Sequence, residues 1–479
     1  MQPPSQIHRR TLLWQATAAS VGAIALPQIV PSSVFGADVP SNKLNLGIIG
    51  CGGRACDHVE HTLTSENIVA LCDVDQRQIA QAKKFLSNRG VADKAKIYDD
   101  YRKLLEEDKS VDAVLIAPGQ RWHVPMCKRA MQAGKHVYCE KPLAHSCAQA
   151  RENRELPKQF PNLATQAGTQ HGASETFRRS VEVIQAGVLG PVREVFCWVD
   201  RGAAGGRRIG TQTDPIPPEL NWDFWCGPSK VLPFMRHYLG FCLNWGEWLE
   251  FGDGHMGDMG MHTLNLPWRA LKLGAPISAS VKIPERLRDS YPSATKFRWE
   301  FAARENLPSV TVWWADGGKY EGQRFIVRDP GVPAELVKEV RTTYGQLPSN
   351  GVLFSGEKGI LWSDAWGNGG IVKLKDEAKG RGVHDHEACK PVPVTLPRAP
   401  GQSNMGEWFT ACKGGPKTFQ GFETAANVVE IAMVGMLVLR FKPGVNAFST
   451  IEWDSEALKV KGAPEADAVV NLPMRQKWL

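Results

Sequence analysis

An apolar stretch that ends in a glycine-rich turn constrains the fold of this chain more than any other feature. Residues 43–50 read KLNLGIIG, residues 51–63 (CGGRACDHVEHTL) change to helical spacing, and residues 67–75 (NIVALCDVD) return to a strand pattern. A strand, a glycine turn, a helix and a second strand in this order are typical of a dinucleotide-binding unit. The pattern therefore predicts a Rossmann domain over residues 38–165.

The small residues of the turn have separate roles. Gly50 allows the tight turn, Gly52 lets the backbone approach a pyrophosphate, and Ala55 lets the helix pack closely on the strand. The helix N-terminus then offers N–H groups to the phosphates. Asp73 closes the second strand, where a carboxylate accepts the ribose hydroxyls and repels a 2′-phosphate, so NAD is favoured over NADP. Arg77 either softens that preference or is a surface cation.

Strands and helices continue to alternate after this unit. VDAVLIAP at 111–118 is expected to be a strand, VPMCKRAMQAG at 124–134 a helix, and KHVYCEKP at 135–142 another strand. This order predicts a doubly wound parallel sheet, which binds ligands beyond the carboxyl ends of its strands. The residues expected around the cofactor are Gly50, Cys51, Gly52, Gly53, Arg54, Ala55, Asp73, Ala117, Pro118, Trp122, His123, Glu140 and Lys141.

The second half of the chain pairs an aspartate with a histidine. In the helical stretch 252–276, Asp258 and His262 lie one turn apart on the same face. His262 is the candidate general base, because its reference pKa of about 6.5 suits proton transfer near neutrality. Asp258 would fix its tautomer, and Lys141 would stabilise a developing alkoxide or relay the proton. The alternatives are a core histidine, a helix cap at Asp258 and an ion pair between Lys141 and Glu140.

Beyond residue 277 apolar and polar residues alternate, as in SVTVWWADG at 309–317. This pattern predicts strands of a large, mainly antiparallel sheet in a C-terminal α/β domain, residues 166–479. A helix is expected over 421–441. Its apolar run contains Glu430 and is too short to span a bilayer, so a buried helix is expected.

The N-terminus has the character of an export signal. Arg9 and Arg10 precede an apolar stretch that runs to about Ile29, and small residues follow near Gly36 and Ala37. The motif RRTLL is similar to the twin-arginine signal, which exports folded proteins. Residues 1–37 are therefore expected to be a signal peptide for a periplasmic or otherwise exported protein.

Composition excludes several other classes of protein. The net charge of +7 is not concentrated in a basic block, so no nucleic-acid partner is expected. The 11 cysteines are scattered, with no ligand spacing of a metal site, and buried thiols are expected at Cys51 and Cys72. The HDH at 384–386 is expected to be a solvated loop, and no metal is expected.

The chain has 16 tryptophans, and about a third of them fall between Trp198 and Trp268. These tryptophans either belong to the core or stack on sugar rings.

The motifs GIIGCGGRA, CDVD, WH and especially AGKHVYCEKP resemble those of the Gfo/Idh/MocA oxidoreductases. The resemblance covers most of the chain after the signal. It implies that Gln170 lies near the nicotinamide, that the Asp258 and His262 pair lies beside Lys141, and that the bond before Pro142 is cis. It also implies that the large sheet forms the floor of the substrate site and an interface of a homodimer or homotetramer.

Three functions follow from these observations. The first is NAD-dependent hydride transfer from a sugar or cyclitol hydroxyl carbon, and the second is glycoside cleavage by transient oxidation and elimination. The third is a non-catalytic ligand-binding protein, against which the apparent completeness of Lys141, Asp258 and His262 argues. Because free nicotinamide is scarce outside the cytoplasm, an exported enzyme should carry tightly bound, recycled NAD that is loaded before export. The expected partner is a small carbohydrate or cyclitol, without stable membrane insertion.

Overall fold

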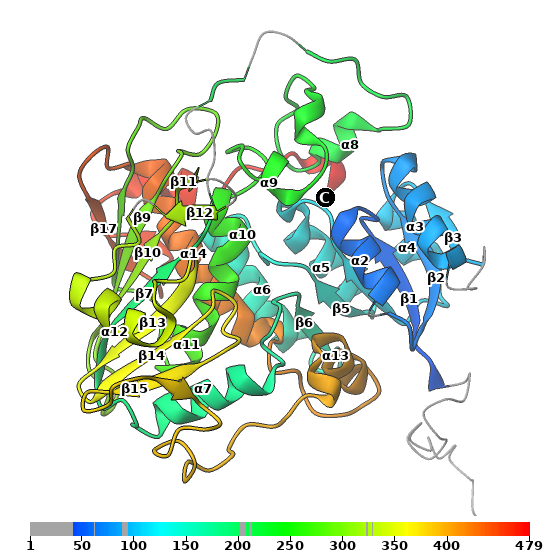
Figure 1. Ribbon diagram of the computed structural model, residues 1–479. Coiled ribbons are helices and arrows are strands. Elements are labelled where there is room, and N and C mark those ends of the chain that lie inside the picture. The colour runs from blue at the N-terminus through cyan, green and yellow to red at the C-terminus, as the bar shows by residue number, and fades with distance from the viewer. Residues whose placement is uncertain are drawn as a thin grey trace, which may run out of the picture. The chain divides into compact units, whose positions relative to one another are not determined.

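The computed structural model describes residues 42–61, 63–88, 94–201, 207–209, 213–321, 324–327 and 329–479. The predicted signal peptide, with Arg9 and Arg10, lies outside the described residues. Residues 43–479 form one compact unit that contains two large sheets (Figure 1).

The first sheet has six parallel strands in the order β3-β2-β1-β4-β5-β6, which confirms the doubly wound prediction. The strand order reverses between β1 and β4, and such a reversal opens a crevice at the carboxyl ends of the strands. The sheet continues two residues beyond position 165, because β6 ends at Ala167. Its elements are β1 (Asn45–Ile49), α2 (Gly53–His61), β2 (Asn67–Cys72), α3 (Gln76–Asn88), β3 (Lys96–Tyr98), α4 (Tyr101–Glu107), β4 (Ala113–Ile116), α5 (His123–Gln132), β5 (His136–Cys139), α6 (Cys147–Gln159) and β6 (Thr165–Ala167).

The second sheet has ten strands in the order β16-β15-β14-β13-β7-β10-β9-β8-β17-β18. Only the β7–β10 pair is parallel, so the prediction of a mainly antiparallel sheet is confirmed. The strands are β7 (Val192–Trp198), β8 (Ser278–Lys282), β9 (Lys296–Phe301), β10 (Val310–Ala315), β13 (Gly351–Gly356), β14 (Gly359–Ser363), β15 (Ile371–Leu374), β16 (Arg381–Gly382), β17 (Ser449–Asp454) and β18 (Lys459–Val460). A separate hairpin pairs β11 (Gly318–Glu321) with β12 (Arg324–Val327).

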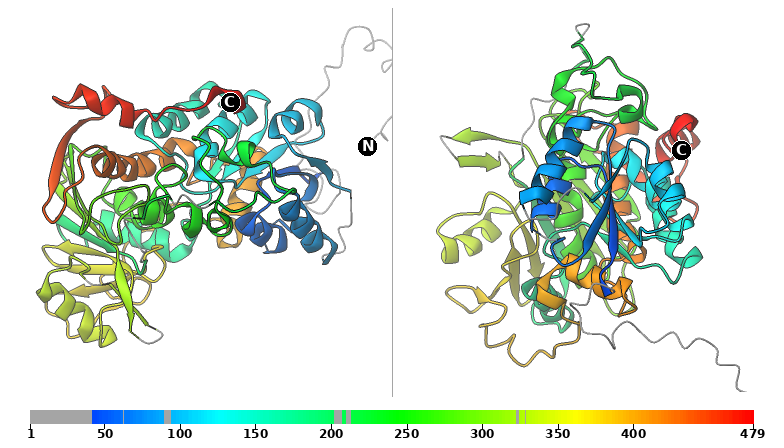
Figure 2. Two further views of the ribbon diagram at one scale, coloured as in Figure 1. Left: turned by 90° about the horizontal axis from the view of Figure 1, so that it is seen from above. Right: turned by 90° about the vertical axis from the view of Figure 1, so that its right-hand side faces the viewer.

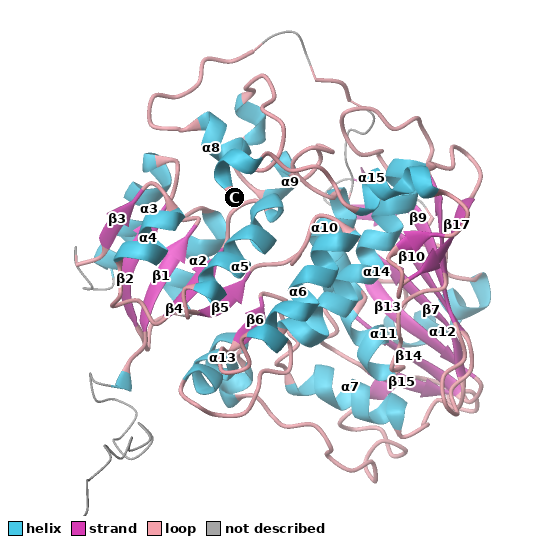
Figure 3. Ribbon diagram, turned by 180° about the vertical axis from the view of Figure 1, so that it is seen from behind, coloured by secondary structure: helices cyan, strands magenta, loops and turns pink. Residues whose placement is uncertain are grey.

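Helices cover the second sheet and join it to the first. In Figure 3, α10 and α14 run between the two sheets. Residues 213–252 are part of the connection from β7 to α10 and carry two short α-helices and a 3-10 helix. The helices of this half are α7 (Glu175–Gln185), α8 (Trp222–Cys226), α9 (Cys242–Trp245), α10 (Gly254–Thr263), α11 (Asn265–Ala270), α12 (Ala334–Tyr344), α13 (Asn404–Cys412), α14 (Phe422–Phe441) and α15 (Asp467–Val470).

The predicted apolar helix is α14, and most of it is buried, as expected. It packs on α6 of the first half and on α10, β8 and β9 of the second. By length and composition, it is the one helix among the described residues that could cross a membrane. Glu430 of α14 is buried and forms ion pairs with Arg151 and Arg154 of α6. Polar contacts therefore also join the N-terminal and C-terminal halves of the chain.

The two halves share cores that a division at residue 165 does not separate. Met405, Trp408 and Phe409 of α13 pack against Ile48 and Tyr138 of the first sheet. The Rossmann half therefore completes its own core with a helix from far along the chain. Figure 2 shows α13, in orange, beside the blue and cyan elements.

Candidate active site

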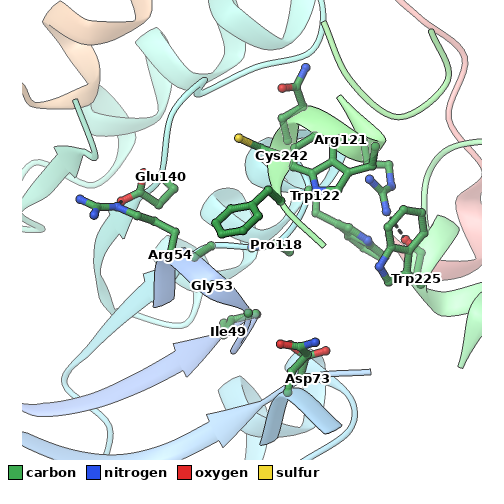
Figure 4. A pocket seen from close by; sticks show the side chains of 18 of the residues that line it. Ile49, Gly53, Arg54, Asp73, Pro118, Arg121, Trp122, Glu140, Trp225 and Cys242 are labelled. Carbon is green, nitrogen blue, oxygen red and sulfur yellow. Dashed lines mark hydrogen bonds and ion pairs between the residues drawn. The ribbon is translucent and has the colours of Figure 1, made fainter. Parts of the chain in front are cut away.

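A cavity of about 720 Å³ lies at the carboxyl ends of the first sheet, and α10 and the 213–252 segment form its other walls (Figure 4). This volume is within the range of small-molecule and cofactor sites. The structure brings most of the predicted residues into its lining. They are Gly50, Gly52, Gly53, Arg54, Asp73, Ala117, Pro118, Trp122, Glu140, Lys141, Gln170 and Asp258.

The glycine turn has the shape that a dinucleotide requires. Gly50 has a φ of +82°, and a Cβ there would lie 2.6 Å from the nitrogen of Pro118. Only glycine tolerates both this backbone conformation and this close approach. At Gly52, by contrast, an added Cβ would meet no atom nearer than 3.7 Å, so the backbone of the turn is open to the cavity. The residues present therefore fit a pyrophosphate held at the start of α2.

Asp73 lies at the end of β2 with both carboxylate oxygens on backbone donors. It accepts from the N–H of Cys51 at 2.6 Å and from that of Asp75 at 2.9 Å. Burial raises the pKa of Asp73 to about 6, because these N–H groups offset only part of the desolvation. Arg77 is committed elsewhere, since its guanidinium forms a bidentate pair with Asp75.

Three residues predicted to contact the cofactor are not in the cavity lining. Cys51 and Ala55 are buried in the packing of α2 on the sheet, and Cys51 contributes only its N–H to Asp73. His123 is also buried, with Nδ1 2.6 Å from the carbonyl oxygen of Pro142 and Nε2 3.1 Å from that of Pro118. It therefore braces two loops of the cavity. The Lys141–Pro142 bond is cis, as the resemblance implied.

Lys141, Asp258 and Arg201 form a charged trio at the other end of the cavity. Lys141 Nζ donates to Asp258 Oδ1 at 2.7 Å and to its backbone oxygen at 2.8 Å, and Arg201 Nε donates to Oδ2 at 3.1 Å. Burial disfavours the charged forms of Lys141 and Asp258, but the attraction between the two groups outweighs this effect. The attraction raises the pKa of Lys141 and holds the pKa of Asp258 well below its usual range. Both groups are therefore charged at neutral pH.

Glu140, the other candidate partner of Lys141, is engaged on a different side. Its Oε1 lies 2.7 Å from His58 Nε2 and 3.3 Å from Arg54 Nε. Burial raises its pKa, but His58 and Arg54 outweigh that effect and lower it to about 2. Glu140 thereby holds Arg54 beside the glycine turn, and the side chain of Lys141 pairs with Asp258.

His262 differs from its prediction. It lies on α10 one turn from Asp258, but both carboxylate oxygens of Asp258 are bound to Lys141 and Arg201. His262 is 1% exposed, lies outside the cavity lining and packs against Trp366, and its Nδ1 has no hydrogen-bond partner among the described residues. Burial, assisted by the charge of Lys141, lowers its pKa to about 3. Asp258 therefore does not fix the tautomer of His262, because stronger cationic partners occupy the carboxylate.

Two domains of one known oxidoreductase family match this chain. The description "Oxidoreductase family, NAD-binding Rossmann fold", of the Gfo/Idh/MocA group, fits residues 44–165, and "Oxidoreductase family, C-terminal alpha/beta domain" fits residues 194–302. The chain belongs to the Gfo/Idh/MocA oxidoreductase family. The resemblance of its motifs is thus confirmed by matches in both halves of the chain.

Curated relatives of this Gfo/Idh/MocA chain match over part of their length. It is 38% identical to glycosyl hydrolase family 109 protein 2 of Shewanella sp. (strain ANA-3), over 25% of this chain and 27% of that protein. It is 29% identical to inositol 2-dehydrogenase of Azotobacter vinelandii, over 38% of this chain and 54% of that protein. The chain therefore spans from about a quarter to about half of these relatives.

Solved structures share the fold over most of the chain. Aldose-aldose oxidoreductase from Caulobacter crescentus is 16% identical, with a TM-score of 0.57 over 86% of this chain and 100% of that one. Levoglucosan dehydrogenase, in complex with NADH and levoglucosan, is 16% identical, with a TM-score of 0.52 over 85% of this chain and 99% of that one. At this identity the likeness establishes the fold of the Gfo/Idh/MocA chain.

Sequence reasoning missed several residues of this Gfo/Idh/MocA site. Arg201 completes the charged trio, and Arg121, Trp225, Phe241 and Cys242 line the cavity. Phe241 is 78% exposed, and its ring lies 3.8 Å from the position of a Cβ on Gly53. The density of tryptophans could have indicated Trp225, but no local pattern marks the others.

The tryptophans between Trp198 and Trp268 serve more than one purpose. Trp198, Trp222 and Trp248 are core residues, whereas Trp225 and Trp245 line the cavity. In the HDH stretch, His384 and Asp385 are exposed as expected, but His386 is buried and pairs with Glu377 at 2.9 Å, so the prediction of a solvated loop is wrong there. Among the described residues, no group of three or more histidine, cysteine or acidic side chains is arranged to hold a metal ion.

Proposed function

We propose that this chain is an NAD-dependent oxidoreductase that transfers a hydride between nicotinamide and a hydroxyl-bearing carbon of a sugar or cyclitol. The supporting observation is one cavity that the glycine turn and Asp73 line at one end and Lys141 and Asp258 at the other, with Arg201 bound to Asp258 from outside the lining. Glycine turns of this kind hold dinucleotides, and the trio offers fixed charge for an oxygen atom. When bound, the nicotinamide supplies the hydride acceptor.

Lys141 is the group best suited to hold the reacting oxygen. Its ammonium has three N–H donors, and the structure uses two of them on Asp258. The third is available to a substrate hydroxyl, where the positive charge would stabilise a developing alkoxide. Asp258 keeps Lys141 charged and in position, and Arg201 holds the other oxygen of that carboxylate.

His262 is proposed as the final acceptor of the hydroxyl proton, and because it is buried outside the cavity lining the proton would reach it by a relay through Lys141 or a water molecule. His262 is neutral at physiological pH, and its Nδ1 is free of a hydrogen-bond partner among the described residues. Its lowered pKa makes it a weak base, so proton transfer would depend on stabilisation of the alkoxide by Lys141. Activity is therefore expected to depend more strongly on Lys141 than on His262.

The cofactor is proposed to be NAD rather than NADP. Asp73 would repel a 2′-phosphate, and Arg77, which could have attracted one, is paired with Asp75.

We also propose that the protein is exported by the twin-arginine route with its cofactor already bound, and that the large sheet mediates a homodimer or homotetramer. Fractionation of cells that express the wild type or an Arg9→Lys, Arg10→Lys variant tests export, and light scattering tests the assembly.

A glycosidase that uses NAD transiently is the second candidate. Its support is the 38% identity to a family 109 glycosyl hydrolase, together with the expected export, since a closed redox cycle needs no free cofactor. In this reaction a sugar hydroxyl is oxidised, the glycosidic substituent is eliminated, water adds, and the hydride returns to the sugar. The same residues would serve both reactions.

The deciding experiment combines cofactor analysis with substrate panels. Denatured protein is analysed for released NAD, and calorimetry measures the binding of NAD and NADP. The protein is then incubated with sugars and cyclitols, and with nitrophenyl glycosides. Accumulation of NADH supports net oxidation, whereas nitrophenol release without NADH supports glycoside cleavage. A protein that neither contains nor binds NAD contradicts both candidates.

A further inference from the structure

The 213–252 segment lies across the end of the cavity that holds Asp73. It runs beside the turn after β2, where Asn221 N–H donates to the oxygen of Val74 at 3.0 Å and Gln76 N–H donates to that of Glu219 at 3.1 Å. Helix α8 follows directly, and its Phe224 and Trp225 form part of the cavity wall. An aromatic wall therefore stands at the end where Asp73 would bind the ribose.

Arg121 fastens α8 from the Rossmann side. Its Nε donates to the oxygen of Cys226 at 3.1 Å, and its Nη2 donates to that of Trp225 at 2.5 Å. The guanidinium carbon also lies 4.1 Å from the centre of the Trp225 ring and 5.0 Å from that of Phe251. Figure 4 shows Arg121 and Trp225 side by side at the cavity wall. A planar guanidinium can make these hydrogen bonds and stack at once, which an ammonium cannot.

The charge of Arg121 is only partly compensated. The side chain is 2% exposed, and Nη1 is buried without a hydrogen-bond partner among the described residues. Because Arg121 lines the cavity, its contacts with α8 form part of the cavity wall.

A second arginine, from the C-terminal segment of the chain, also fastens α8. Arg475 Nε donates to the oxygens of Gly227 at 3.0 Å and Ser229 at 2.6 Å, and its Nη1 lies 2.5 Å from Asp223 Oδ1. Trp478 stacks on Phe224, with ring centres 4.1 Å apart and planes 7° apart. Figure 1 shows this end of the chain beside α8. Two residues far apart in the sequence, Arg121 and Arg475, therefore hold the same short helix.

We infer that Arg121 and Arg475 lock α8 over the adenosine half of bound NAD and so set how long the cofactor stays bound. NAD cannot leave past Phe224 and Trp225 unless the 213–252 segment lifts and these contacts break. Arg121 and Arg475 are therefore positioning residues that retain the cofactor and take no part in hydride transfer. This inference rests on the proposed function, because it requires NAD in the cavity.

The test measures dissociation of NAD directly. The NAD-loaded wild type, Arg121→Ala, Arg121→Lys and Arg475→Ala proteins are mixed with excess thionicotinamide dinucleotide, and the NAD that remains bound is followed by chromatography. We expect dissociation at least about tenfold faster in Arg121→Ala and Arg475→Ala, with Arg121→Lys intermediate. Hydride transfer in a single turnover should stay within about threefold of wild type in Arg475→Ala, since Arg475 lies outside the cavity lining and does not touch the charged trio.

A buried arginine outside the cavity provides the matched control. Arg269 stacks on Phe419 at 3.9 Å and donates to its backbone oxygen at 2.7 Å, much as Arg121 does with Trp225. Arg269→Lys should leave NAD dissociation at the wild-type rate. Hydrogen exchange in the NAD-free protein gives a second readout: the amides of Gln76 and Asn221 should exchange faster in both alanine variants and not in Arg269→Lys.

Wild-type dissociation rates in both alanine variants would overturn the inference. If Arg121→Ala does not fold, Arg475→Ala and Arg121→Lys decide the question, because Arg475 is partly exposed and lysine keeps the charge. A wild-type protein that binds no NAD in calorimetry contradicts the proposed function itself. The two failures are therefore distinguishable.

Discussion

The two ends of the cavity each carry an aspartate, and the two carboxylates behave in opposite ways. Burial raises the pKa of Asp73 to about 6, because its partners are only backbone N–H groups. At Asp258, burial acts in the same direction, but Lys141 and Arg201 outweigh it and hold the pKa well below its usual range. The chemistry of the side chain is the same, and the neighbours decide its charge.

At the Asp73 end of the cavity polar groups are incompletely paired, whereas at the Lys141 end the charged groups are paired without a ligand. At the binding end, Asp73 is poorly compensated and Arg121 has a buried N–H without a partner among the described residues. At the other end, the charges of Lys141, Asp258 and Arg201 already satisfy one another. A bound dinucleotide would thus complete the first region, whereas the second holds its geometry beforehand, as electrostatic catalysis requires.

The strongest test of this comparison removes the cation of the preorganised end. Lys141→Met should lower the rate of hydride transfer by about 10³-fold, because Lys141 holds the reacting oxygen. NAD content and dissociation should remain at wild-type values. Stopped-flow absorbance of NADH measures the first quantity, and chromatography measures the second.

Lys135, at the opposite end of β5, provides the control. It is buried and donates to the oxygen of Val111 at 2.6 Å, outside the cavity. Lys135→Met should change hydride transfer by less than about twofold. A Lys141→Met rate within a few-fold of that control would remove Lys141 from the mechanism.

The next test exposes the dependence of Lys141 on its partner. Asp258→Asn removes the carboxylate that most strongly opposes the effect of burial on Lys141, so the pKa of Lys141 should fall. Because the ammonium is the active form, the alkaline limb of the rate profile should move to lower pH, and kcat should fall about 10²-fold. Single-turnover rates between pH 6 and 10 measure both effects.

Asp200 serves as the comparison for that variant, since it pairs with Arg201 at 3.1 Å and does not touch Lys141. Asp200→Asn should leave the alkaline limb in place. An alkaline limb that does not move in Asp258→Asn would show that Lys141 is not the group that titrates.

A smaller effect is expected at His262. His262→Gln should reduce kcat by about 30-fold, and the wild-type rate should show no limb near pH 6.5 from this residue. Its depressed pKa also has a consequence for stability. The pKa of His262 is about 3 in the folded protein and about 6.5 in the unfolded chain. Between these pH values the unfolded chain binds a proton that the folded protein does not bind, so the free energy of unfolding falls by roughly 4–5 kcal/mol at most as the pH falls. Acid unfolding followed by circular dichroism should be less steep in His262→Gln.

The smallest predicted effect concerns Asp73. Its ionised form is the better acceptor for ribose hydroxyls, so NAD affinity should fall by about tenfold between pH 7 and pH 5 as the carboxyl is protonated. Calorimetry across this range measures it, and Asp73→Asn should bind weakly with a flat profile. An affinity that is equally flat in the wild type would argue that Asp73 does not contact the ribose.

The sequence predicted the Rossmann half well because its signals are local. Gly50 and Asp73 belong to one βαβ unit, and neighbouring parallel strands must bring their ends to the same edge. The alternation beyond residue 277 likewise predicted the second sheet. The position of Asp258 beside Lys141 came from the family resemblance, since no spacing relates residues so far apart.

Helical spacing was a poor guide to the partner of His262. It correctly placed Asp258 and His262 on one helix, but a pair one turn apart interacts weakly compared with a buried ion pair. Lys141 and Arg201, from other parts of the chain, bind both carboxylate oxygens. His123 likewise became a brace between Pro118 and Pro142 rather than a contact for the cofactor.

By itself, the sequence determined the two kinds of sheet, the glycine turn and the acidic end of β2, because each is encoded within a single element or between neighbours. Only the tertiary structure decided that Arg201 completes the charged trio, that His262 is withdrawn from the cavity, and that Arg121 and Arg475 hold one helix between them. These outcomes depend on burial and on charges that meet across distant segments. A carboxylate acquires its partners, and therefore its pKa, only when the chain has folded around it.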